Sequence, residues 1–97
     1  MFVTVLRGYV SRENWSTLQK AFAEAVRHPP KDLLHSVLVQ SVDDPMQWQI
    51  ISFWTSYEAY KEAEAKKETD NCVQLFCAAG STPTRRGYRV SERFSRI

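Results

Sequence analysis

The side chains of this sequence that could best take part in binding or catalysis are an indole, several phenols, two imidazoles and scattered guanidinium groups. Trp54 ends an apolar run, and Tyr57 and Tyr60 follow it at helical spacing. An indole can stack on a flat ligand and donate one hydrogen bond, while a buried phenol needs a polar partner. We predict Trp54 as a catalytic residue and Tyr57 and Tyr60 as substrate-binding residues. The competing interpretation is the corner of an apolar core.

Three further residues are candidates for the same site. His35 alternates with apolar residues on a predicted strand, where a neutral imidazole can act as a base. Arg7 stands among apolar neighbours and, if it points inward, needs a carboxylate or an anionic ligand. We predict both as catalytic and Phe76 as substrate-binding. The alternatives are a hydrogen-bonded core or interface histidine and a core phenylalanine.

Three arginines share one face of the last predicted strand, at Arg85, Arg89 and Arg93. Such a stripe can hold an anionic substrate, or it can be a solvated face whose exposed ion pairs contribute little stability. Both interpretations stay open at the level of sequence.

Several function classes find no support in the sequence. Cys72 and Cys77 have no third ligand at zinc spacing, and the three glycines form no phosphate-binding motif, so we predict neither a metal nor a cofactor. The 13 basic and 11 acidic residues balance to +2, which favours neither nucleic acid nor a membrane surface. Without a long apolar run or a signal peptide, we expect a cytoplasmic protein.

The elements that must position these residues can be read from periodicity and turn signals. Alternating apolar patterns predict strands over Phe2–Val10, Leu33–Val42, Gln47–Trp54 and Arg86–Phe94. We predict a helix that Ser11 caps and Pro29 ends, a second from a Thr55–Glu58 capping box to Lys67, and a short third one between Asp70 and Gly80. The order predicts one α+β domain over residues 1–97, a ferredoxin-like βαββαβ fold with a four-stranded antiparallel sheet.

Both faces of the predicted sheet are apolar. On the first strand Val3, Val5 and Tyr9 alternate with Phe2 and Leu6, so neither set is polar. Two helices cover one face only, and a face in water should be polar. We therefore expect a homodimer in which the sheets pack face to face, because two-fold dimers are the commonest oligomers.

The segments "SFWTSYEAY", "FCAAGSTPT" and "GYRV" resemble the antibiotic biosynthesis monooxygenase superfamily of dimeric α+β barrels. The resemblance covers residues 2–94, and its most specific parts are Trp54 with Ser56 and the Ala-Ala-Gly-x-x-Pro segment. It implies a cavity between the sheet and the second helical region. It also implies a cofactor-independent monooxygenase of a small aromatic or quinol substrate, with a non-catalytic dimeric binding protein as the alternative.

Two departures from that superfamily bear on the activity. Haem-degrading members carry an asparagine on the first strand and a haem-ligating histidine on the second helical region, and this chain has neither. Phenol-oxidising members pair the tryptophan with an asparagine on the same strand, where this chain has only Gln47 and Gln49.

Overall fold

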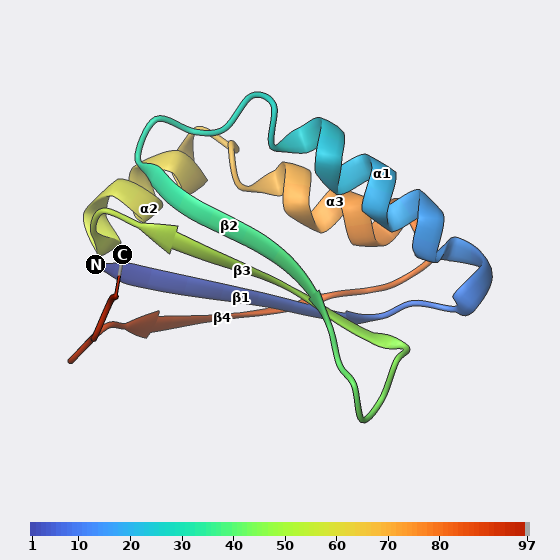
Figure 1. Cartoon of the computed structure of the whole chain (residues 1–97). Helices are drawn as coiled ribbons and strands as arrows, with labels where there is room; N and C mark the ends of the chain where they lie inside the picture. Colours follow the sequence, from blue (N-terminus) through green and yellow to red (C-terminus); the bar gives the residue numbers. More distant parts are fainter. Residues whose placement is uncertain (97) are drawn as a thin grey trace.

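A four-stranded antiparallel sheet carries all the helices on one face (Figure 1). The computed structural model describes residues 1–96. The strands are β1 (Phe2–Tyr9), β2 (Leu33–Gln40), β3 (Gln47–Trp54) and β4 (Thr84–Arg89), and they lie in the order β2-β3-β1-β4. The helices are the short 3-10 helix η1 (Arg12–Asn14), α1 (Trp15–Ala25), α2 (Tyr57–Ala65) and α3 (Asp70–Ala78). The predicted ferredoxin-like fold is confirmed.

The core between sheet and helices is divided into two clusters. The larger one joins β1 and β3 to α1 and α3 through buried residues that include Leu6, Leu18, Ile50 and Phe76. The smaller one lies under α2 and consists of Phe2, Trp54, Tyr60 and Ala63. Figure 1 shows the same division, with α2 over one end of the sheet and the α1–α3 pair over the other.

Gly8 is required where β1 meets α3. A Cβ atom at Gly8 would lie 2.6 Å from Cδ1 of Phe76 and 2.7 Å from Oγ of Ser81. The Phe76 side chain is fully buried, so it has no room to move away.

We expect Gly8→Ala to lower the free energy of unfolding by about 1–3 kcal/mol, the usual cost of an overpacked core. Urea denaturation measures this change. If overpacking is the cause, the cost shrinks in a Phe76→Leu background, which gives the new methyl group space. An equal cost in both backgrounds would contradict this explanation.

Three details of the predicted elements are wrong. The cap of α2 is Ser56, whose Oγ accepts a hydrogen bond from the Ala59 N–H at 3.0 Å, rather than Thr55. Thr55 still belongs to the sheet end, since its N–H donates to the Asp32 carbonyl at 3.1 Å. Ser11 precedes η1 without a side-chain cap, and β4 covers Thr84–Arg89 instead of Arg86–Phe94.

Strand β2 also departs from simple alternation. A register shift between Leu33 and His35 turns Leu33 toward the helices, where it packs against the α2 cluster. His35 pairs with Phe53 and lies on the opposite face. Leu33 and Val37, which strict alternation along the strand would place on one face, therefore lie on opposite faces, and the cause is the bulge.

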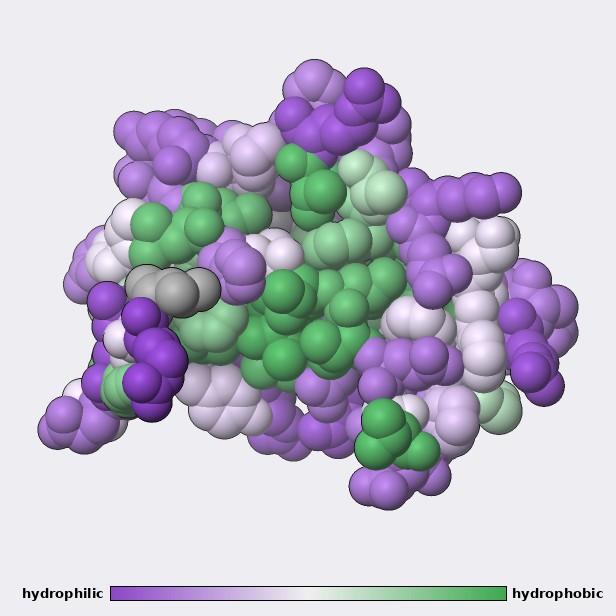
Figure 2. Space-filling model, viewed as in Figure 1, coloured by the Kyte–Doolittle hydropathy of each residue, from purple (hydrophilic) through white to green (hydrophobic). Residues whose placement is uncertain are grey.

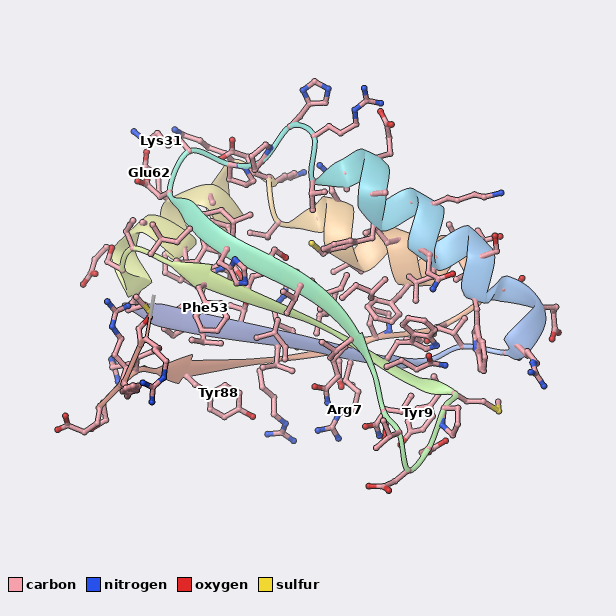
Figure 3. The ribbon with its side chains drawn as sticks, in the orientation of Figure 1. Arg7, Tyr9, Lys31, Phe53, Glu62 and Tyr88 are labelled. Carbon is pink, nitrogen blue, oxygen red and sulfur yellow. The ribbon has the colours of Figure 1, made fainter. Side chains whose placement is uncertain are left out.

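The sheet face away from the helices is apolar along its centre. Val5 pairs with Ile51, and Ile51 pairs with Val37, so the three form one row across the strands. Figure 2 shows apolar surface gathered over the middle of the sheet and surrounded by hydrophilic side chains. Arg7, Tyr9 and Tyr88 project on this side, away from the helices (Figure 3). No helix in residues 1–96 is long and apolar enough to cross a membrane.

Candidate functional site

A cavity lies between the two core clusters, under the C-terminal end of α1 and beside the junction of α2 and α3. Its free volume is about 50 Å³, which is room for several water molecules. Its apolar walls come from α1, the Pro29–Pro30 link and the sheet. Polar groups enter from the sheet floor, from β4, and from α2, α3 and their junction: Thr4, Ser36, Ser52, Arg85, Tyr60, Thr69 and Cys72.

The floor of the cavity is a row of small residues that crosses the whole sheet. Ser36 pairs with Ser52, Ser52 with Thr4, and Thr4 with Gly87. The rows on either side contain large side chains, including Trp54 and Phe2 in one and Ile50 and Leu6 in the other. The cavity exists because this one row is too short to reach the helices, so the two clusters do not merge.

The hydroxyl groups of this floor are hydrogen-bonded, with Thr4 and Ser52 buried and Ser36 half-buried. The Oγ atoms of Ser36 and Ser52 lie 3.0 Å apart, and the Trp54 indole N–H donates to Oγ1 of Thr4 at 3.3 Å. Each hydroxyl has one proton and two acceptor positions, so one such bond leaves capacity for a ligand. Trp54 is thus fixed against the floor while it forms part of the cavity wall.

The polar end of the cavity is built around Arg85. Its guanidinium donates to the Thr69 carbonyl at 3.0 Å, and no salt bridge joins it to a carboxylate within residues 1–96. The Thr69 hydroxyl is buried and has no hydrogen-bond partner within the same residues. A half-buried cation and an unpartnered hydroxyl together favour a ligand that brings an acidic oxygen to this end.

Arg85 also influences the neighbouring acids. Burial raises the pKa of Tyr60 above its usual value of 10.0, and the positive charge of Arg85 works against that rise. The Tyr60 hydroxyl donates to Glu64 at 3.1 Å, and Lys61 holds the pKa of Glu64 below its usual value, mainly through a direct hydrogen bond. Tyr60 is therefore a neutral hydrogen-bonding group at neutral pH.

The two cysteines are expected to differ in reactivity. Burial raises the pKa of Cys72 above 9.0, whereas Cys77 is exposed on α3. Because the thiolate is the nucleophile, each unit of raised pKa lowers the reactive fraction about tenfold below that pKa. With a Cys77→Ser protein, we expect iodoacetamide to label Cys72 more slowly than it labels Cys77 in a Cys72→Ser protein at pH 8, because burial raises the pKa of Cys72 and limits access to its thiol.

The pH dependence of this difference has a defined sign. Labelling of Cys72 rises with pH and is still rising at pH 9.0, the usual pKa of a thiol, because burial raises the pKa of Cys72 above that value. Because the pKa of Cys72 is higher in the folded than in the unfolded protein, its contribution to the free energy of unfolding is fully present below pH 9. That contribution is lost as the pH rises through the raised pKa. Equal rates for the two thiols at pH 8 would contradict the buried position of Cys72.

The structure brings together only part of the predicted site. Trp54 and Tyr60 line the cavity, and their rings pack edge to face with centroids 5.3 Å apart. Tyr57 lies just outside, where its ring contacts Phe2. The Phe76 side chain is fully buried in the α1–α3 core cluster.

His35 and Arg7 lie across the sheet from this cavity. Both are on the face away from the helices, where His35 packs on Phe53 and Arg7 pairs with Gln49. The cavity therefore does not include them.

The hydroxyl floor is the part of the site that sequence reasoning did not identify. A signal was present, since Thr4 and Ser52 are the polar residues at the inward positions of β1 and β3, and Ser36 lies between the apolar residues Leu33 and Leu38 on the inward side of β2. Their alignment in one row depends on strand register, and for Ser36 it depends on the bulge after Leu33.

The fold and cavity place the chain in a structural class. Its sheet order and single helical layer are those of antibiotic biosynthesis monooxygenase structures, although no family model and no curated protein matches the sequence. A proposed antibiotic biosynthesis monooxygenase from Deinococcus radiodurans superposes with a TM-score of 0.76 at 16% identity, covering 100% of this chain and 99% of that one.

Two further structures have this fold and a described activity or ligand. SnoaB, a cofactor-independent oxygenase from Streptomyces nogalater, gives a TM-score of 0.66 at 20% identity, covering 95% of this chain and 94% of its own. A variant of MhuD with two manganese protoporphyrin IX molecules per active site gives 0.76 at 16% identity, covering 98% and 99%. At such identities the likeness establishes the fold.

Proposed function

We propose that the protein is a cofactor-independent monooxygenase of a small aromatic or quinol substrate, which binds in the cavity over the hydroxyl floor. The observation that carries the proposal is the combination of apolar walls with one cation, Arg85, that has no carboxylate partner in the described chain. The fold shared with SnoaB supports the same reaction class.

The proposed reaction requires the substrate to supply its own electrons. A phenol loses its proton, the phenolate passes one electron to O₂, and the resulting radical pair combines to form a ring hydroperoxide. Loss of water then leaves a carbonyl, so that one phenol and one O₂ give one quinone and one water. The protein has to exclude water, orient the ring and stabilise the phenolate.

The cavity residues suit these tasks. The Trp54 indole provides a flat apolar wall, and its position is fixed by the hydrogen bond to Thr4. Arg85 would stabilise the phenolate oxygen, with a hydrogen bond from the Thr69 hydroxyl, which has no partner within residues 1–96. His28 and Glu68 also line the cavity and are groups that can accept the phenol's proton. We assign His35 and Arg7 no contact with the substrate, since they lie on the other face.

A non-catalytic binding protein is the second candidate. The observation that favours it is the absence of an asparagine beside Trp54 on β3, which carries Gln47 and Gln49 instead. Binding alone needs the cavity and Arg85 but no route for oxygen or protons.

Oxygen uptake separates the two candidates. Polarographic measurements with a panel of reduced naphthohydroquinones and polyphenols are expected to show enzyme-dependent consumption that falls in Trp54→Phe. If that folded variant loses a measurable reaction, the binding-only candidate fails. No uptake across the panel by a folded protein that still binds the compounds would contradict the monooxygenase.

We also propose that the protein is a homodimer whose two sheets pack through their apolar faces. The support is the row of Val5, Ile51 and Val37 at the centre of a face that no helix covers. A second copy offers a matching surface, because a two-fold axis brings the same residues together from both sides. The cytoplasmic location expected from the sequence stays a prediction.

A further inference from the structure

A second hollow lies beside the cavity, along the inward side of β4. We call it the β4 groove, and it is lined by Phe2, Thr4, Tyr57, Tyr60, Lys61, Arg85, Gly87 and Arg89. It is open to solvent. Its free volume of about 380 Å³ is far larger than that of the cavity. Gly87 and Arg89 are exposed there, because α2 packs on the neighbouring end of the sheet and not on β4.

The shape of the groove depends on Gly87. A Cβ atom at this position would lie 2.6 Å from Cζ of Phe2. The glycine therefore lets the Phe2 ring lean over β4, where it packs on Tyr57 and Tyr60 with centroids 5.1 and 5.3 Å away. The result is an aromatic wall beside a bare strand.

The charge of the groove is positive. Arg85 and Arg89 have no carboxylate partner within the described residues, while Lys61 is paired with Glu64 at 2.6 Å. The Arg89 guanidinium lies over the Tyr57 ring, 5.7 Å from its centroid, which orients its N–H groups beside the wall. Two guanidinium groups on one face of a strand are well suited to a planar oxyanion.

The groove and the cavity are continuous. Thr4, Tyr60 and Arg85 line both, so a ligand that contacts these three residues can extend in either direction. The cavity alone has room for little more than part of a ring system, whereas the groove has room for a substituent. Arg85 lies at the junction and can contact both parts of such a ligand.

We propose that the β4 groove binds an anionic substituent of the aromatic ligand, a carboxylate or a similar oxyanion, so that the substrate is an aromatic acid. The inference rests on the proposed function only for the position of the reacting ring. Arg89 and Arg85 hold the acid group, and Tyr57 and Phe2 contact the apolar link between acid and ring.

Binding without turnover tests the groove separately from the reaction. We would titrate the protein by calorimetry with 2-naphthalenesulfonate and with neutral 2-naphthalenemethanol, which share one ring system. The sulfonate is expected to bind about tenfold more tightly, because charge-assisted hydrogen bonds are the stronger ones. Arg89→Met should remove most of that preference and leave the affinity for the alcohol unchanged.

Arg12→Met is the matched control, since Arg12 is an exposed guanidinium that stacks on Trp15 at 5.5 Å, away from the groove. It should retain the preference, and circular dichroism confirms that each variant is folded. Equal affinities for the two compounds, no binding of either, or a preference that survives Arg89→Met would each overturn the proposal. Acid-selective binding without oxygen uptake would support acid binding in the β4 groove and contradict the monooxygenase reaction. Turnover with equal affinities for the two compounds would support the monooxygenase reaction and contradict acid binding in the groove.

Discussion

Ile51→Asp is expected to dissociate the proposed sheet-to-sheet dimer into monomers. Ile51 lies at the centre of the open sheet face, between Val5 on β1 and Val37 on β2. A two-fold interface would bury the new carboxylate twice, and an unpaired buried charge costs several kcal/mol. We therefore expect the dissociation constant to rise at least about a thousandfold, since each 1.4 kcal/mol is a factor of ten.

Sedimentation equilibrium at micromolar concentration measures this effect. Val42→Asp is the matched control, because Val42 is 92% exposed near the β2–β3 turn and the same charge there should leave the dimer intact. A wild-type monomer would refute the face-to-face packing at once. An Ile51→Asp protein that remains a dimer would place the interface elsewhere.

Arg85→Met is expected to have the largest effect on turnover. Removing one preorganised group that stabilises a developing oxyanion typically lowers kcat about 10²–10³-fold. The structural cost should be moderate, about 1.5–3 kcal/mol, because the variant loses one hydrogen bond from a charged group to the Thr69 carbonyl. Oxygen-uptake kinetics with the best substrate of the panel measure the first value, and urea denaturation measures the second.

A second readout makes this prediction testable without a substrate. The charge of Arg85 lowers the pKa of Tyr60, against the larger effect of burial. In Arg85→Met the Tyr60 pKa should therefore rise further, which an absorbance titration of the phenols detects. Arg86→Met removes the same charge from the next position of β4 and should leave the Tyr60 titration unchanged. An unchanged Tyr60 titration in Arg85→Met would contradict the geometry of this end of the cavity.

The sequence was sufficient for the order of elements because the signals were local. Strand β3 was predicted with its observed bounds, since Trp48, Ile50 and Trp54 recur on one face up to the capping signal at Thr55. The end of β4 was not, because Val90 continues the alternation of Tyr88 beyond Arg89, the last residue of the strand that pairs with β1. Periodicity records which residues could form a strand, and pairing decides which do.

The candidate site was harder to predict because it depends on contacts between distant segments. Trp54 and Tyr60 were predicted from their types and spacing, and the structure places both on the cavity wall. The positions of His35 and Leu33 depend on one bulge, which moves Leu33 into the core and leaves His35 on the far face. Such a bulge follows from packing across the sheet, which a single sequence does not display.

Arg85 illustrates the same limit for charged residues. From the sequence it was one of three arginines that either bind an anion or face solvent. The structure separates them, since Arg85 is half-buried at the cavity, Arg89 lies over Tyr57, and Arg93 lies beyond the end of β4. The three arginines differ in exposure, because the α2–α3 junction covers Arg85 and leaves Arg89 and Arg93 exposed.

The most direct test of the proposed monooxygenase reaction is an oxygen-isotope experiment. The protein would be incubated with the best substrate of the panel under heavy-oxygen gas (18O₂), and the product analysed by mass spectrometry. The proposed monooxygenase reaction should place one heavy oxygen atom in the quinone and the second in water. Arg85→Met should sharply reduce the amount of labelled product. An unlabelled product, or oxygen recovered only as hydrogen peroxide, would contradict a monooxygenase.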